Sequence, residues 1–263
     1  MKRIVVGADG SPGAAYAMRW AASIAAAMEV EVVAMTGSPG QEQDLLRWWE
    51  AARVGELDVR CVVEEGDPRP GILRVAEREE ADLVVVGRYG ISSGPGLLHL
   101  GSMAEWLAHH AELPLAVVGG VVNLPMHGAL VGVDGSAGSR AAVGWVRDVA
   151  AGVPIRIVAA SVQQPIVEWT PASSPENWRR GVERRIVEDF AAELTGAGLE
   201  FAPTALRGTS VADTLVEAAR HERADLIVVG ARGLGGFSGL RIGGIALKAL
   251  HAADRPIVLV PSG

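Results

Sequence analysis

The stretch that decides the fold is Ile4-Val5-Val6-Gly7-Ala8-Asp9-Gly10-Ser11. It recurs in the second half of the chain as Leu130-Val131-Gly132-Val133-Asp134-Gly135-Ser136. A second pair of stretches also matches, Ala81-Asp82-Leu83-Val84-Val85-Val86-Gly87 and Ala224-Asp225-Leu226-Ile227-Val228-Val229-Gly230. Because the same landmarks return in the same order, the sequence predicts that one domain has been duplicated.

The length of the chain suits two small domains. Its 263 residues make each half long enough to bury its own core. Each half ends in an apolar run that begins with proline, 114–118 in the first half and 256–260 in the second. Glycine and proline interrupt the pattern between the halves. We therefore predict one domain over 1–120, a second over 128–263, and a linker over 121–127.

Within each half, short apolar runs alternate with segments of helical periodicity. Residues 4–8 predict a buried strand, after which Ser11 is a suitable N-cap and Pro12 suits the first helical position. Strands that alternate with helices require right-handed crossovers and form parallel sheets covered on both faces. The predicted fold class is α/β, with two tandem five-stranded parallel sheets in the Rossmann-like strand order 3-2-1-4-5.

The periodicity also predicts element boundaries for the first half. The further strands expected there are 30–35, 59–63, 83–86 and 115–118, and the further helices are 41–56, 70–80 and 102–110. Of the neighbouring Trp48 and Trp49, we expect one to pack and the other to be exposed or to meet a partner. The charged run 77–80 is interpreted as solvated.

A ligand site is expected at the carboxyl ends of the strands. In an open parallel sheet, ligands bind where the strand order reverses. In the order 3-2-1-4-5, that point lies between strands one and four. Asp9 and Gly87 end these strands in the first half, and Asp134 and Gly230 end them in the second. The repeated motifs are therefore predicted to converge on one candidate site in each half.

A glycine-rich loop follows strand four in each half, 87–102 and 230–244. Glycine lets the backbone approach phosphate oxygens closely, and the N–H groups at a helix start attract anions. A flexible surface loop is the alternative that glycine content alone favours, but repetition at both switch points favours phosphate binding. Arg88 and Arg232 lie between loop glycines, where each could reach a phosphate or stay in solvent.

These motifs resemble those of the universal stress protein family, over nearly all of both halves. Nucleotide-binding members carry Gly-x2-Gly-x9-Gly-Ser/Thr after strand four and an aspartate near the adenine, whereas members without the glycines do not bind ATP. The resemblance implies a fold of the adenine nucleotide alpha hydrolase type that often dimerises through its last strand. It identifies these candidate ATP-binding residues: Asp9, Gly87, Gly90, Gly101, Ser102, Asp134, Gly230, Gly233, Gly243 and Gly244.

Each half departs from the family pattern once. In the second half the glycine spacing is kept, but Gly244 stands where Ser or Thr is expected. In the first half Ser102 is present, but the interval from Gly90 to Gly101 is one residue longer and contains Pro95. The resemblance implies ATP binding, with or without Mg²⁺, in at least one half.

Composition argues against several classes of partner. The net charge is −7 and no long basic run occurs, so neither nucleic acid nor an anionic membrane is expected to bind. No apolar run approaches the ~20 residues of a membrane span. The single cysteine, Cys61, leaves no intrachain disulfide, and no set of metal ligands is evident. These features predict a cytoplasmic protein.

Signatures of an enzyme are missing. The chain contains neither a Gly-x4-Gly-Lys-Ser/Thr phosphate loop nor a Gly-x-Ser-x-Gly elbow with a suitable histidine. The leading hypothesis is an adenine-nucleotide-binding module with a regulatory role in stress response. The alternative is the same fold with degenerate sites, acting in interaction or dimerisation, and slow ATP hydrolysis is a third, weaker option. The closing strands are exposed apolar edges, so we expect the halves to pair within one chain, with a homodimer as a further option.

Overall fold

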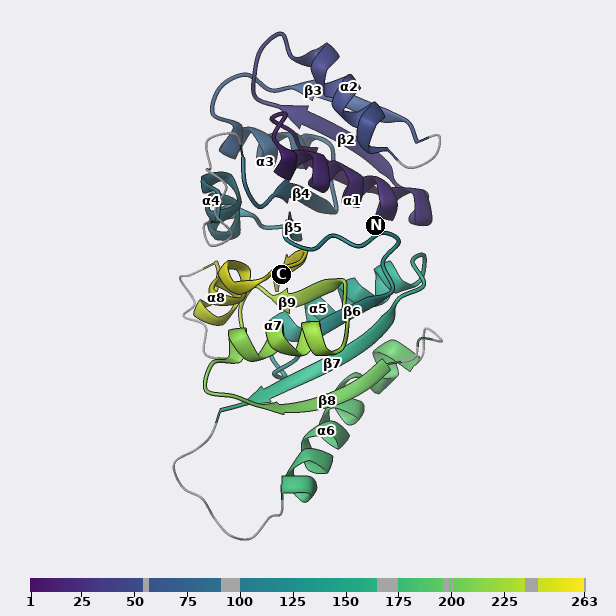
Figure 1. Ribbon diagram of the computed structural model, residues 1–263, viewed down its shortest axis with the longest axis vertical. Helices are drawn as coiled ribbons and strands as arrows, with labels where there is room; N and C mark the ends of the chain where they lie inside the picture. Colours follow the sequence, from purple (N-terminus) through teal and green to yellow (C-terminus); the bar gives the residue numbers. More distant parts are fainter. Residues whose placement is uncertain are drawn as a thin grey trace. The chain divides into compact units, whose positions relative to one another are not determined.

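The chain forms two compact units (Figure 1). The computed structural model describes residues 1–53, 57–90, 100–164, 175–195, 199, 201–234 and 241–262. Unit 1 consists of Met1–Pro125 with Asp254–Val258, and unit 2 consists of Met126–Ala253 with Leu259–Gly263. The chain passes from one unit to the other between Pro125 and Met126, within the segment predicted as a linker.

The first half of the chain alternates strands and helices as predicted. Its strands are parallel and lie in the order β3-β2-β1-β4-β5, which confirms the predicted order 3-2-1-4-5. The elements in chain order are β1 (Arg3–Gly7), α1 (Pro12–Met28), β2 (Glu31–Thr36), α2 (Glu42–Ala52), β3 (Val59–Val63), α3 (Pro68–Arg78), β4 (Leu83–Gly87), α4 (Ser102–His110) and β5 (Leu115–Val118).

The second half repeats this arrangement. Its strand order is β8-β7-β6-β9-β10, so β6 takes the place of β1 and pairs in parallel with both β7 and β9. The elements in chain order are β6 (Gly128–Gly132), α5 (Ala137–Ala150), β7 (Arg156–Gln163), α6 (Pro175–Thr195), β8 (Phe201–Arg207), α7 (Val211–His221), β9 (Leu226–Gly230), α8 (Gly244–Ala252) and β10 (Ile257–Val260).

Local capping sets the helix starts. The Ser11 hydroxyl accepts the N–H of Ala14 at 3.1 Å and Pro12 is the first residue of α1, as predicted. Helix α3 begins at Pro68, two residues earlier than predicted, because the Asp67 carboxylate accepts the N–H of Arg69 and caps the helix there. Helix α2 ends at Ala52, earlier than predicted, and residues 54–56 lie outside the described residues.

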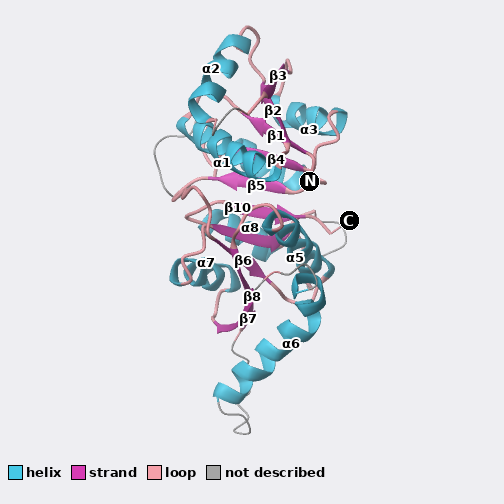
Figure 2. Cartoon of the chain, turned by 90° about the vertical axis from the view of Figure 1, so that its right-hand side faces the viewer, coloured by secondary structure: helices cyan, strands magenta, loops and turns pink. Residues whose placement is uncertain are grey.

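Each sheet is covered by helices on both faces, as Figure 2 shows. Helices α1 and α2 lie on one side of the strands of unit 1 and α3 on the other, while in unit 2 α5 and α6 lie opposite α7. The central strands are therefore buried on both faces and are continuously apolar, as in Leu83–Gly87 and Leu226–Gly230. Every helix in the described part of the chain is either too short or too polar to span a bilayer.

The adjacent tryptophans of α2 have different surroundings. Trp49 is buried, whereas Trp48 is half-buried. The Trp48 indole packs on Gly10, since a Cβ atom on Gly10 would lie 2.6 Å from Cζ2 of Trp48. The less buried tryptophan thus contacts the β1–α1 loop of its own unit.

The aspartate of each repeated Ala-Asp-Leu motif anchors the amino end of a sheet. Oδ2 of Asp82 accepts the N–H groups of Lys2 and Arg3, the latter at 3.0 Å. Oδ2 of Asp225 accepts the N–H groups of His127 at 2.7 Å and Gly128 at 3.2 Å. Each aspartate satisfies backbone donors where the first strand of its half begins. This part of the motif is structural and lies at the opposite ends of the strands from the predicted ligand sites.

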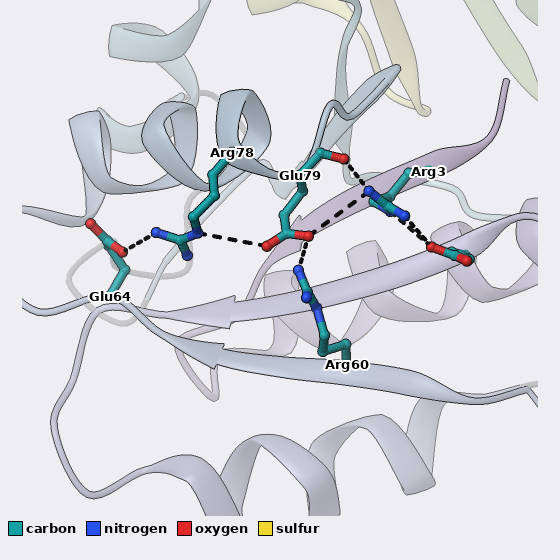
Figure 3. A network of polar contacts seen from close by, with 6 residues as sticks. Arg3, Arg60, Glu64, Arg78 and Glu79 are labelled. Atoms are coloured by element: carbon teal, nitrogen blue, oxygen red, sulfur yellow. Dashed lines mark hydrogen bonds and ion pairs between the residues drawn. The ribbon is translucent and has the colours of Figure 1, made fainter.

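The charged run at the end of α3 is only partly solvated, which corrects the interpretation from sequence. Glu79 is 7% exposed and its carboxylate is paired with Arg60 from β3 (Figure 3). Nη1 of Arg3 lies 3.9 Å from one Glu79 carboxylate oxygen, and Nε of Arg78 lies 3.6 Å from the other. The charge at Glu79 is buried because cations from two strands and its own helix surround it. In the second half, Glu222 pairs with Arg156 at 3.2 Å.

Candidate functional site

A pocket opens at the carboxyl ends of the strands in unit 2. Its volume is about 440 Å³, within the range of small-molecule sites in proteins. The ends of β6, β7 and β9 and the first turns of α5, α7 and α8 contribute its walls. This is the point between β6 and β9 at which the strand order reverses, where an open parallel sheet is expected to bind a ligand.

The structure brings together all of the candidate residues from the second half. Each of them lines this one pocket: Asp134, Gly230, Gly233, Gly243 and Gly244. Apolar side chains complete the lining on the side of β7 and α7, among them Val162 and Leu215. The pocket therefore combines an apolar wall with one carboxylate and a glycine-lined helix start.

Asp134 ties two loops together at this pocket. Its Oδ1 accepts the N–H of Ser136 at 2.9 Å and its Oδ2 accepts the N–H of Leu234 at 3.1 Å. Burial alone would raise the pKa of the Asp134 carboxyl, but hydrogen bonds from Ser136, Leu234 and Ser139 outweigh it and lower that pKa. The group is an acceptor at neutral pH. Its contribution to stability is complete above the usual aspartate pKa and is lost as the pH falls through the lowered one.

The first motif glycine is required by helix packing. A Cβ atom on Gly230 would lie 2.4 Å from the carbonyl carbon of Gly138, in the first turn of α5. A Cβ atom on Gly138 would in turn lie 2.0 Å from the carbonyl oxygen of Arg232. This contact gives a packing reason for glycine at position 230, in addition to the phosphate role that remains a prediction. Helix α5 can approach β9 closely only because neither residue has a side chain.

The partner glycines of this contact, Gly138 and its counterpart Gly13, were not predicted as site residues. Unit 1 repeats it, because a Cβ atom on Gly87 would lie 2.5 Å from the carbonyl carbon of Gly13 and one on Gly13 would lie 2.1 Å from the carbonyl oxygen of Tyr89. The signal was present in the sequence as Asp-Gly-Ser-x-Gly, which begins at Asp9 and again at Asp134.

The later motif glycines differ in how much space surrounds them. A Cβ atom on Gly233 would lie 2.6 Å from Oδ2 of Asp134, so this glycine makes room for the carboxylate. A Cβ atom on Gly243 would make only ordinary contact, 3.5 Å from the Ala231 carbonyl oxygen, and one on Gly244 would meet nothing within 4 Å. A hydroxyl-bearing side chain would therefore fit at position 244.

The start of α8 offers backbone donors to the pocket. Its N-cap is Gly243, which has no side chain to accept the N–H groups of the first turn. In contrast, Ser136 caps α5 by accepting the N–H of Ser139 at 3.1 Å. Uncapped N–H groups at a helix start attract anions. The glycine loop of unit 2 thus ends in a favourable position for a phosphate group.

Of the two loop arginines, Arg88 is buried and Arg232 is half-buried. Arg88 is 2% exposed. It packs on Gly119, since a Cβ atom on Gly119 would lie 2.5 Å from the Cβ atom of Arg88. Nη2 of Arg232 donates to the carbonyl oxygen of Ser262 at 3.2 Å and contacts its hydroxyl at 3.1 Å. Arg88 is a packed side chain, and Arg232, which lines the pocket, is held by Ser262.

The candidate residues of unit 1 also lie together. Oδ1 of Asp9 accepts the N–H of Ser11 at 2.9 Å, and a Cβ atom on Gly90 would lie 2.8 Å from Oδ2 of Asp9. A Cβ atom on Gly101 would lie 2.9 Å from the carbonyl oxygen of Arg88. Ser102 is the first residue of α4, and Gly87 ends β4. The inserted residue and Pro95 fall in 91–99, outside the described residues.

The two candidate sites differ at the loop after the first strand. Trp48 packs on Gly10 in unit 1, whereas a Cβ atom on Gly135 of unit 2 would meet nothing within 4 Å.

Throughout the described part of the chain, no three His, Cys, Asp or Glu side chains are grouped so that they could hold a metal ion.

Fold and site together define a duplicated α/β domain of the Rossmann-like class, with a glycine loop at the switch point of each sheet. The universal stress protein family matches residues 1–48, 38–119 and 126–261. The chain therefore belongs to the universal stress protein family and carries two such domains in tandem.

Relatives support this assignment along the whole chain. Universal stress protein Rv2623 of Mycobacterium tuberculosis is 29% identical over 294 residues, covering 97% of this chain and 95% of the relative. Universal stress protein Mb2028c of Mycobacterium bovis is 30% identical over 217 residues, covering 78% of this chain and 69% of the relative. The fold alone is similar to that of a universal stress protein structure from Archaeoglobus fulgidus, with a TM-score of 0.73 at 17% identity, covering 99% of this chain and 98% of that one.

Proposed function

We propose that this protein binds ATP, with or without Mg²⁺, and that unit 2 holds the principal site. The observation that carries the proposal is the convergence of the five second-half candidate residues on one pocket of about 440 Å³. Nucleotide binding would make the protein a regulatory module of a stress response in the cytoplasm. Unit 1, with the same arrangement of Asp9 and its glycines, is proposed as a weaker second site.

The chemistry of the pocket suits the two ends of an adenine nucleotide. The ionised Asp134 carboxylate is an acceptor for an amino group, and Val162 and Leu215 offer apolar surface to a base. The backbone N–H groups at the start of α8 suit the phosphates. Among the described residues, the charged side chains that line the pocket are Asp134, Arg232 and Lys248. Binding without a dedicated reaction is the proposed activity, in line with the missing phosphate-loop and nucleophile-elbow motifs in the sequence.

Native mass spectrometry of the purified full-length protein tests the proposal, followed by calorimetric titration with ATP. We expect bound adenine nucleotide in the purified protein, or saturable binding of added ATP, with at least one nucleotide per chain. If the protein purifies without bound nucleotide and gives no heat when titrated with ATP, that result would instead support the alternative function, in which the fold serves interaction or dimerisation alone.

The substitution Gly244→Ser is expected to strengthen ATP binding roughly 3- to 10-fold, because a hydroxyl would donate to a charged phosphate. The side chain enters open space, so no rearrangement is needed. Calorimetry measures the change. The control is Gly181→Ser in α6, another helical glycine whose Cβ would meet nothing within 4 Å and which does not line the pocket. Equal effects of the two substitutions would show that position 244 does not face the phosphates.

A further inference from the structure

We propose that Lys248 is the cation with which the unit 2 pocket selects nucleotides that carry a polyphosphate chain. The inference rests on the proposed function, because it assigns a role to a residue within the proposed nucleotide site. Lys248 lies outside the glycine motif, and it would determine which adenine nucleotide binds best.

The position of Lys248 in α8 directs its side chain toward the proposed phosphate site. Lys248 follows Gly244 by four residues, which is about one helical turn. Long side chains on a helix lean toward its N-terminus and lie over the preceding turn. The Lys248 side chain lines the pocket together with Gly243 and Gly244, in agreement with that direction.

The charges around the pocket leave Lys248 as the available cation. Arg232 also lines the pocket, but its guanidinium donates to Ser262. Asp134 contributes negative charge and accepts backbone N–H groups. Lys248 is exposed, and its ammonium has no hydrogen-bond or ion-pair partner among the described residues. An incoming phosphate group would therefore meet an ammonium that gives up no existing contact.

The corresponding helix of unit 1 supports this assignment by contrast. Counted from the N-cap glycine of each helix, Ser102 corresponds to Gly244 and Trp106 corresponds to Lys248. The Trp106 ring is stacked on His110, with 3.9 Å between ring centroids. At these two helix positions unit 1 has a hydroxyl and no cation, whereas unit 2 has a cation and no hydroxyl. The ammonium takes over the role of the missing hydroxyl as the side-chain partner of the phosphates.

The preference for longer phosphate chains follows from the difference between a hydroxyl and an ammonium as partners of the phosphates. A hydroxyl makes one short-range hydrogen bond, while an ammonium interacts with the total charge of the phosphate chain. Each further phosphate adds negative charge near Lys248. The pocket is therefore expected to bind ATP more tightly than ADP, and ADP more tightly than AMP, with adenosine as the weakest ligand.

The test measures the affinities of full-length wild-type protein and Lys248→Gln for ATP, ADP, AMP and adenosine by calorimetry. We expect Lys248→Gln to weaken ATP binding about 5- to 10-fold, to weaken AMP binding less and to leave adenosine unchanged. Lys248→Arg should retain most of the preference for ATP. The matched control is Arg220→Gln, which removes the same charge from the last turn of α7, away from the pocket.

Each outcome distinguishes this inference from the proposed function. If wild-type protein binds none of the four ligands, the proposed function fails and the inference fails with it. If wild-type protein binds ATP and Lys248→Gln retains the same order and strength of binding, the inference alone is overturned. An equal loss for all four ligands, adenosine included, would also overturn it, because that loss would reflect a disturbed helix.

Discussion

Replacing Gly138 by alanine is expected to lower the free energy of unfolding by about 2–4 kcal/mol. The new methyl group would lie 2.0 Å from the carbonyl oxygen of Arg232, and a backbone atom cannot move aside as a flexible side chain can. Either the first turn of α5 or the glycine loop after β9 would have to shift. Because that loop lines the pocket, we expect ATP affinity to fall as well.

The same helix provides a matched control. Gly144 is also in α5, but a Cβ atom there would meet nothing within 4 Å. Gly144→Ala is therefore expected to raise the free energy of unfolding by about 0.5–1 kcal/mol, since glycine is a poor residue inside a helix. Urea unfolding followed by circular dichroism measures both variants. If Gly138→Ala unfolds at the same urea concentration as wild-type protein, the close contact between α5 and β9 is not present in solution.

Replacing Asp134 by alanine is expected to weaken ATP binding about 10- to 150-fold, which corresponds to a hydrogen bond to a charged group worth about 1.5–3 kcal/mol. The carboxylate is ionised, and it lines the pocket while it holds the N–H groups of Ser136 and Leu234. Its loss removes an acceptor for the ligand and loosens the loop that leads to the phosphate site. Calorimetry with ATP measures the change, and thermal melting shows how much of it comes from the fold.

Two controls accompany this variant. Asp148→Ala removes the same charge from an exposed aspartate at the other end of α5, where its partner is Arg147, and should leave affinity unchanged. Asp9→Ala removes the corresponding residue of unit 1 and is expected to weaken ATP binding less than Asp134→Ala. A larger effect of Asp9→Ala would make unit 1 the principal site.

The fold was predictable because the signals that determine it are local and occur twice. The parallel sheet followed from the apolar runs and the crossover rule, and its strand order is that expected of the Rossmann-like class. The start of α1 followed from Ser11 and Pro12. The early start of α3 was missed because Asp67 as a cap competes with the apolar periodicity of the helix. Such errors shift a boundary by one turn or less and leave the topology unchanged.

The site was less predictable because its decisive contacts join residues far apart in the sequence. Gly13 and Tyr89 lie far apart in the sequence, so the repeated Asp-Gly-Ser-x-Gly pattern marks Gly13 but does not show which backbone atoms a side chain there would meet. Arginine is usually found on the protein surface, yet Arg88 is buried and Gly119 packs on it. Lys248 lies outside the glycine motif, and only the direction of helical side chains brings it to the pocket.

The paired anchors Asp82 and Asp225 have a consequence for how the two copies can diverge. Each aspartate holds its sheet at the amino ends of the strands, through backbone N–H groups that every residue except proline supplies. Mutations at the opposite edge leave these anchors untouched. One copy can therefore accumulate changes such as an inserted loop residue or an exchanged hydroxyl while it still folds. In each copy, residues at the carboxyl ends of the strands can therefore vary while the contacts at the amino ends keep the domain folded.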